Sequence, residues 1–318
     1  MELSNWKDDS DDEFVNSQPP PKKKKNIHSY IDGEAGYTIE DFSVFPEKCI
    51  DEDHSGVSTP LDFFSIFFSD KVFEFIRDQS IQYSGLVFTM EELHAVFGVL
   101  IGSGVVSQKR RRDYWSNNQL KKNVAISKSI GQKRFESIFS ALHFLPMDAN
   151  ISNDKFQKIR LLYSMLNRSF IKNTPRCSSF SIDEAMVPYY GRHGCKQHIK
   201  GKPLRFGFKQ WVLATPMGYC CQIQPYPGLA ERSTEDYDYG ASGNIVYFFC
   251  KLFREHLANN TAFSVTVDNF FSSLKLFQDL YLKLNVLATG TFRVNRIPQN
   301  PFPYATLKKS VRGTFQTK

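Results

Sequence analysis

The spacing of apolar residues changes once along this chain, and that change limits the folds it can adopt. From Thr59 to about residue 172, apolar side chains recur every three to four positions, the period of an amphipathic helix. After Pro175 they recur at every second position, the period of a strand with one buried face. The sequence therefore predicts a helical domain followed by a domain built on a sheet.

Residues 59–175 are predicted to form the helical domain. Thr59 and Pro60 have the pattern of an N-cap followed by proline at the first helical position, and a helix is expected over residues 61–76. Thr89, with Glu92 three residues later, is a capping-box pattern and begins a second helix. Two further helical patterns follow, at residues 135–142 and 156–166.

The remainder, residues 176–293, is predicted to be α/β, with antiparallel and parallel strands. Three extended runs come first, followed by a helix, a strand, a helix and a strand, at residues 180–183, 206–215, 219–225, 245–257, 263–268, 274–284 and 286–292. This order of strands and helices is typical of an α/β fold with both antiparallel and parallel parts.

Two aspartates occupy matching places in this pattern. Asp183 and Asp268 each lie on the face opposite the large apolar residues of their strand, at or near the end of that strand. If the two strands are neighbours, both carboxylates meet at one sheet edge and can share divalent cations such as Mg²⁺. Glu184 alternates to the other face and is not counted as a ligand. An aspartate at a strand end is also a common turn residue, so the residues alone leave both interpretations open.

Cations gather in two places, and the formal net charge of +7 favours a polyanionic partner. A glycine-containing loop after Asp183 offers phosphate contacts from Arg192, Lys196, Lys200, Lys202 and Arg205, or is a solvated charged hairpin. A second cluster, Arg110, Arg111 and Arg112, precedes Tyr114 and Trp115, whose rings are expected to pack into the core. A zinc site at His193, Cys195 and His198 is disfavoured, because no fourth ligand has matching spacing.

Residues 1–58 are predicted to be a disordered tail that begins acidic and then turns basic. Its proline-flanked run of Lys22, Lys23, Lys24 and Lys25 resembles a nuclear import signal, and a basic linker is the alternative. No membrane partner is expected. The longest apolar stretch, residues 93–106, is interrupted by His94 and is shorter than the roughly 20 residues that span a bilayer.

Three segments of this sequence resemble the signature of the piggyBac transposases and their domesticated relatives. They are Ser181-Ile182-Asp183-Glu184-Ala185-Met186-Val187-Pro188-Tyr189-Tyr190-Gly191-Arg192, the run from Lys200 to Lys209, and Val267-Asp268-Asn269-Phe270-Phe271-Ser272-Ser273. Partial matches at residues 109–115 and 134–142 extend the resemblance upstream to about residue 59. The resemblance therefore covers about residues 59 to 318.

The resemblance implies a ribonuclease H-like, retroviral-integrase-like catalytic domain preceded by a helical dimerisation and DNA-binding domain. It implies cut-and-paste DNA transposition in the nucleus, with transposon ends or derived genomic sites as DNA partners and a homodimer as a possible assembly. Asp183 and Asp268 would be the first two metal ligands. A third aspartate would complete a site for two Mg²⁺ or Mn²⁺ ions.

In the family, the third aspartate follows an inserted domain. Residues 294–318 are expected to begin that insertion, and no Asp or Glu follows Phe292, so we expect the catalytic domain to be incomplete in this chain. Three functions stay open. The chain is an inactive transposase-derived DNA-binding protein, part of an active transposase whose C-terminal part lies outside this sequence, or a nuclear interaction module without a role at DNA.

Overall fold

The computed structural model describes seven stretches of the chain: residues 56–149, 154–175, 177–201, 203–227, 239–257, 262–293 and 296–297. They belong to two compact units, one on each side of the boundary between Asn173 and Thr174. The predicted tail lies outside the described residues except for residues 56–58. The predicted segment 294–318 lies outside them except for residues 296–297.

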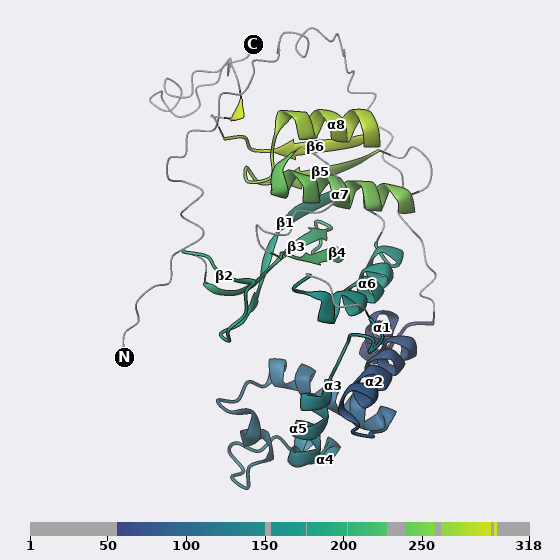
Figure 1. Cartoon of the computed structure of the whole chain (residues 1–318), viewed down its shortest axis with the longest axis vertical. Coiled ribbons are helices and arrows are strands. Elements are labelled where there is room, and N and C mark those ends of the chain that lie inside the picture. The colour runs from purple at the N-terminus through teal and green to yellow at the C-terminus, as the bar shows by residue number, and fades with distance from the viewer. Residues whose placement is uncertain are drawn as a thin grey trace. The chain divides into compact units, whose positions relative to one another are not determined.

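The first unit is helical, as the period of its apolar residues predicts (Figure 1). Its elements are α1 (Pro60–Phe67), α2 (Asp70–Ser84), α3 (Met90–Val105), the 3₁₀ helix η3 (Arg111–Trp115), α4 (Val124–Ser129), α5 (Gln132–Ala141) and α6 (Gln157–Lys172). Their apolar faces form one core, in which Ile76, Leu93, Val96, Phe135 and Ile138 are completely buried. Within the described residues, no helix has the length and apolar character needed to cross a bilayer.

Threonine caps begin two of these helices, and both predicted helix starts are confirmed. The hydroxyls of Thr59 and Thr89 each accept a hydrogen bond from the N–H of the third helical residue. The carboxylates of those residues, Asp62 and Glu92, accept from the threonine N–H in return. Each box therefore satisfies two backbone donors that the helix itself leaves without partners.

The continuous helix predicted over residues 61–76 is wrong. α1 ends at Phe67, Phe68 adopts φ −103° and ψ 67°, and α2 begins after Ser69. The apolar residues keep their helical spacing across the break, since both helices contribute side chains to the same core. A change of helix axis without a change of buried face leaves no mark in the periodicity.

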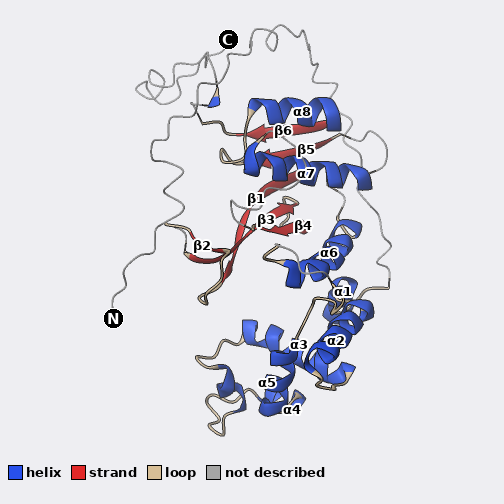
Figure 2. Ribbon diagram, viewed as in Figure 1, coloured by secondary structure: helices blue, strands red, loops and turns tan. Residues whose placement is uncertain are grey.

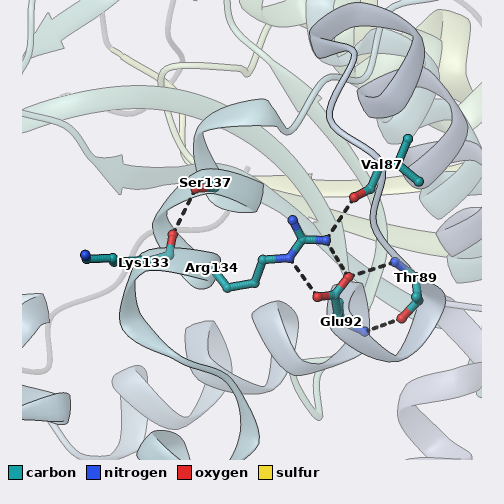
Figure 3. A network of polar contacts seen from close by, with 6 residues as sticks. All are labelled: Val87, Thr89, Glu92, Lys133, Arg134 and Ser137. Carbon is teal, nitrogen blue, oxygen red and sulfur yellow. Dashed lines mark hydrogen bonds and ion pairs between the residues drawn. The ribbon is translucent and has the colours of Figure 1, made fainter.

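Glu92 also joins α3 to α5 (Figure 3). Its two carboxylate oxygens accept hydrogen bonds of 2.7 Å from the Arg134 guanidinium, which donates a further bond of 2.9 Å to the Val87 carbonyl. The hydrogen bond from Arg134, followed by that from the Thr89 backbone, lowers the pKa of Glu92 to about 2. The bidentate ion pair fixes the first turn of α3 against α5.

The second unit holds a six-stranded mixed sheet (Figure 2). Its elements are β1 (Ser179–Pro188), β2 (Lys196–His198), β3 (Phe206–Ala214), β4 (Cys220–Pro225), α7 (Gly240–His256), β5 (Phe263–Val267), α8 (Leu274–Leu284) and β6 (Val286–Gly290). The strand order is β2-β3-β1-β5-β6, with β4 also paired to β3. β1 is antiparallel to β3 and parallel to β5, and β5 is parallel to β6, which confirms the mixed α/β prediction.

Two details of this unit differ from the prediction. The loop expected at residues 191–205 contains β2, whose three residues pair with β3 and are too few to show a period. α7 begins at Gly240, earlier than the expected start at Ile245. In Figure 1, β2 and the adjoining ends of β1 and β3 project from the part of the sheet that α7 and α8 cover.

α7 covers the apolar face of the two central strands. Its Phe253 ring lies 4.6 Å from the Phe180 ring on β1 and 5.4 Å from the Phe263 ring on β5, between centroids. On the opposite face of the same strands, Ser181 and Thr266 are exposed. On β1 and β5, therefore, the apolar face lies under α7 and the polar face is open among the described residues.

Candidate metal centre and nucleic-acid surface

The register of β1 and β5 brings the two predicted aspartates together. The parallel ladder pairs Ser179 with Ser264 and continues to Ile182 with Val267, and each pair is 85 residues apart in the sequence. Asp183 and Asp268 are separated by the same 85 residues (268 minus 183) and directly follow the last pair. Because neighbouring strands lie about 4.8 Å apart, the two aspartates lie side by side at the end of the ladder.

Both carboxylates have the same local setting. Ile182 and Val267 are buried, whereas Asp183 and Asp268, each one residue further along, are exposed. Each aspartate accepts a hydrogen bond at Oδ1 from the next backbone N–H, at 2.7 Å for Asp183 and 2.5 Å for Asp268. The alternation of the strands thus turns two oxygen-donor groups to the open face of the sheet.

β1 does not end at Asp183, contrary to the expectation that the aspartate lies at or near a strand end. The strand continues to Pro188, because its second half pairs antiparallel with β3, from Asp183 with Val212 to Pro188 with Gly207. What ends at Ile182 is the parallel pairing with β5. β1 therefore pairs with β5 on one edge as far as Ile182 and with β3 on its other edge from Ser181 onward, so Asp183 is the first residue of β1 beyond the ladder with β5.

A tight turn follows Asp268. Its carbonyl accepts hydrogen bonds of 3.0 Å from the Phe271 N–H and from the Ser272 hydroxyl. Beyond β6, the Arg293 guanidinium donates to the Asn269 side chain at 3.4 Å. Arg296 donates to the carbonyls of Asn269, Phe270 and Ser272 at 3.1, 3.2 and 3.1 Å.

Arg293 and Arg296 were not predicted as neighbours of the second aspartate. Their position directly after β6 could have predicted this contact. β5 and β6 are parallel strands joined through α8, so the segments that follow them emerge at the same edge of the sheet.

The donor set of the two aspartates fits a hard divalent cation. Carboxylate oxygens are ligands that Mg²⁺ accepts, with waters at its remaining positions. Among the described residues, no three His, Cys, Asp or Glu side chains come together in a group that could hold a metal ion. Two of the three residues considered for a zinc site make hydrogen bonds instead. His193 Nδ1 accepts from the Cys195 N–H at 3.1 Å, and the Cys195 thiol donates to the Pro227 carbonyl at 3.4 Å.

The predicted basic loop, residues 191–205, forms a hairpin with the start of β3, and the cations of this hairpin lie along the strands that lead away from the aspartates. Lys196 of β2 pairs with Phe208 of β3, and Phe208 pairs with Val187 of β1, four residues beyond Asp183. At about 3.3 Å per residue, this places β2 roughly 13 Å along the strand from Asp183. Arg192, Lys200 and Arg205 are described in the same hairpin, and Lys202 lies outside the described residues.

The charge of this region is one-sided over a long stretch. Between Glu184 and Glu231 the sequence has no acidic residue. Aromatic side chains lie among the cations: the His198 ring stacks on the Phe206 ring at 4.7 Å, and the Lys196 ammonium lies 5.6 Å from the same ring. Cations clustered in a stretch of sequence that has no acidic residue favour contact with a phosphate backbone.

The second predicted cluster has a mixed structural role. Arg111 makes a bidentate ion pair with Glu136, with its closer contact at 2.8 Å, and its guanidinium lies 4.6 Å from the Phe139 ring. Tyr114 is buried, and the Trp115 indole N–H donates to the Ile130 carbonyl at 2.7 Å. The expectation that these two aromatics pack into the core is therefore confirmed. The neighbouring Arg110 and Arg112 are exposed.

Comparisons with known proteins agree on one family. The family model described as Transposase IS4 matches residues 59–318. PiggyBac transposable element-derived protein 3 of Homo sapiens is 37% identical over 97% of this chain and 54% of its own length. PiggyBac transposable element-derived protein 2 of Homo sapiens is 34% identical over 82% of this chain and 44% of its own length. The chain thus spans about half the length of these relatives.

A solved structure supports the fold. It is the cryo-electron microscopy structure of a piggyBac transposase synaptic complex with hairpin DNA, which the chain matches with a TM-score of 0.63 at 22% identity. The match covers 81% of this chain and 55% of that chain. The predicted α/β class with a ribonuclease H-like domain is therefore confirmed at the level of the fold.

Proposed function

The chain belongs to the transposase IS4 family, in its piggyBac branch, and from that premise we propose that it is a DNA-binding protein whose Asp183 and Asp268 are ligands of a divalent metal ion. Cut-and-paste DNA transposition is the reaction implied by membership of this family. Among the described residues, Asp183 and Asp268 are the ones we propose to take part in it. The observation that carries the proposal is the common separation of 85 residues, shared by the β1–β5 ladder and by the two aspartates that follow it.

Transposases of this family use a divalent metal ion, and the carboxylates of Asp183 and Asp268 are the groups we propose to hold it. A bound ion of this kind would supply charge stabilisation for a phosphodiester and activation of water. The open face of the sheet gives both aspartates access to solvent and substrate, while buried Ile182 and Val267 anchor their backbones. We propose Mg²⁺ or Mn²⁺ as the ion, with two such ions bound in the complete enzyme.

We propose two separate groups of DNA-contacting cations, one in the hairpin and one in the helical unit. The hairpin group is Arg192, Lys200 and Arg205, which are exposed, half-buried Lys196, and Lys202, which lies outside the described residues; the helical unit contributes exposed Arg110 and Arg112. Arg111 stays in the proposal as a weaker contributor, because binding to a phosphate competes with its ion pair to Glu136. The hairpin's lack of acidic residues supports this assignment, and so does the DNA complex formed by the structurally similar transposase.

The salt dependence of DNA binding tests this surface. We expect the protein to bind a fluorescent duplex of arbitrary sequence with an affinity that falls steeply with salt. The triple substitution Arg192→Ala, Lys196→Ala and Lys200→Ala should weaken binding. It should also make the negative slope of log K against log salt shallower by about 3, roughly one for each lost phosphate contact. Fluorescence anisotropy over a salt series measures both effects.

A matched triple variant controls for net charge. Lys251→Ala, Lys275→Ala and Lys283→Ala remove the same charge from α7 and α8 of the same unit, and this variant should keep the wild-type slope. If both triples change the slope equally, the hairpin is not the binding surface. If the wild-type protein ignores DNA at low salt, the chain is a protein-interaction module and the proposal fails.

Two further parts of the proposal concern the cell and the assembly. We propose nuclear localisation, with residues 22–25 as the import signal, and a homodimer formed through the helical unit. The nuclear location is supported by the basic run in the sequence, and the homodimer by membership of the family. Sedimentation of the purified protein over a concentration series would distinguish monomer from dimer.

A further inference from the structure

The ammonium group of Lys209 on β3 lies among three aromatic rings. The distances from Nζ to the ring centroids are 4.2 Å for Trp211, 4.7 Å for Phe270 and 5.4 Å for Tyr226. These rings come from β3 itself, from the turn after β5 and from the residue after β4. A cation within about 6 Å of a ring centroid is attracted by the ring quadrupole, so this one group links three separate segments.

β3 presents Lys209 and Trp211 on the same face, two residues apart, because side chains alternate along a strand. Trp211 is buried, and the Tyr226 N–H donates to the Lys209 carbonyl at 2.9 Å, which fixes the third ring beside β3. The Trp211 ring also lies 6.1 Å from the Phe270 ring, at an interplanar angle of 24°. The contact between β3 and the turn is therefore made by a packed group of side chains.

The turn that carries Phe270 also carries the second aspartate. β5 ends at Val267, so no strand pairing holds Asp268, and its position depends on the contacts of the residues that follow. Phe270 is two residues beyond Asp268, and Phe271 lies against Trp211 at 5.2 Å. Asp183, by contrast, lies within β1 and is held by its pairing with β3.

We propose that Lys209 is a positioning residue for the second metal ligand. By holding Phe270 against β3, its ammonium fixes the turn after β5 and so keeps Asp268 beside Asp183. This inference rests on the proposed function, because it assumes that the two aspartates bind a divalent ion. Placement of this kind matters for chemistry, since an error of about 1 Å at a reacting group can cost roughly 100-fold in rate.

The test compares Mn²⁺ binding by the full chain and its variants, with free Mn²⁺ measured by electron paramagnetic resonance. Lys209→Met keeps the length of the side chain and removes its charge, and it should raise the Mn²⁺ dissociation constant by about five- to tenfold. Lys209→Arg should restore binding to within about twofold of wild type, because a guanidinium also stacks on aromatic rings. Phe270→Leu should weaken binding as Lys209→Met does, and the double variant should add little.

Lys275→Met is the matched control. Lys275 lies over the Tyr239 ring at 5.6 Å on α8, so the same substitution removes a similar contact away from the aspartates. This variant should bind Mn²⁺ as the wild type does. Thermal unfolding of every variant, monitored by tryptophan fluorescence, distinguishes loss of folding from loss of metal binding.

The outcomes distinguish the two proposals. If Asp183→Asn and Asp268→Asn abolish Mn²⁺ binding while Lys209→Met binds normally, the positioning role is refuted and the metal site stands. If the aspartate variants bind Mn²⁺ as the wild type does, the proposed metal site is itself wrong. If Lys209→Met does not fold, Phe270→Leu and Lys209→Arg decide, and normal Mn²⁺ binding by folded Phe270→Leu overturns the inference.

Discussion

Gly290, at the end of β6, shows how closely the turn around Asp268 packs against the sheet. A Cβ at this position would lie 2.7 Å from both the Ser272 hydroxyl oxygen and the Val267 carbonyl oxygen. Neither atom belongs to a long side chain that could move aside. Arg296 holds the same turn through the carbonyls of Asn269, Phe270 and Ser272, so any side chain at Gly290 must displace the segment that carries the second carboxylate.

Gly290→Ala is therefore expected to destabilise the protein by about 1–3 kcal/mol, the usual cost of overpacking. Gly98→Ala is the control, because Gly98 lies in α3 and a Cβ there has nothing within 4 Å. It should stabilise by up to about 1 kcal/mol through helix propensity. Urea unfolding of both variants measures the two signs. Equal and small effects would mean that the turn is loosely packed.

At single residues, the sequence predicts what alternation controls and little more. Asp183 and Asp268 were found because period-2 spacing assigns them to one face and Glu184 to the other. The contact of Lys209 with Phe270 depends on how the turn after β5 folds back onto β3. No local pattern encodes that approach. Arg111 illustrates the same limit, because its pairing with Glu136 joins residues 25 positions apart.

Among the elements, α3 offers the clearest dependence on pH. Glu92 is ionised in the folded state with a pKa of about 2, well below its ordinary value of 4.5. A lowered carboxyl pKa contributes stability that is fully present above the ordinary value and is lost as pH falls toward the folded value. The first turn of α3 should therefore weaken between about pH 4.5 and pH 2.

Glu92→Gln should remove this part of the pH dependence while lowering stability at neutral pH by up to about 1 kcal/mol, because glutamine can still accept from the Thr89 N–H but loses the ion pair with Arg134. Arg134→Met should have a similar effect, and the double variant should be no worse than the single ones, since both remove the same ion pair. Urea midpoints at neutral and acid pH measure this. Additive losses would show that the two side chains act separately.

Element starts and ends were predictable where a cap or a change of period marks them. The starts of α1 and α3 carry threonine caps, and α8 covers the predicted range 274–284. The break between α1 and α2 was missed because the buried face continues across it. β2 was missed because three residues give no period, and its existence depends on β3 being beside it.

For the whole molecule, the proposed nuclear location gives a test that needs no knowledge of DNA targets. Replacing Lys22, Lys23, Lys24 and Lys25 by alanine should abolish nuclear accumulation of a fluorescent fusion, because import signals of this type depend on clustered positive charge. The Lys251, Lys275 and Lys283 triple variant should still accumulate in the nucleus. If residues 22–25 are dispensable, the run is a basic linker.

The acid-free stretch has a practical consequence for peptide mapping. A protease that cleaves after glutamate would cut at Glu184 and next at Glu231, and would release β2, β3 and β4 within one peptide. Asp183, Asp268 and the arginines of η3 would all leave in other fragments. Light-induced attachment of DNA to that peptide would therefore assign bound DNA to the hairpin from a single mass.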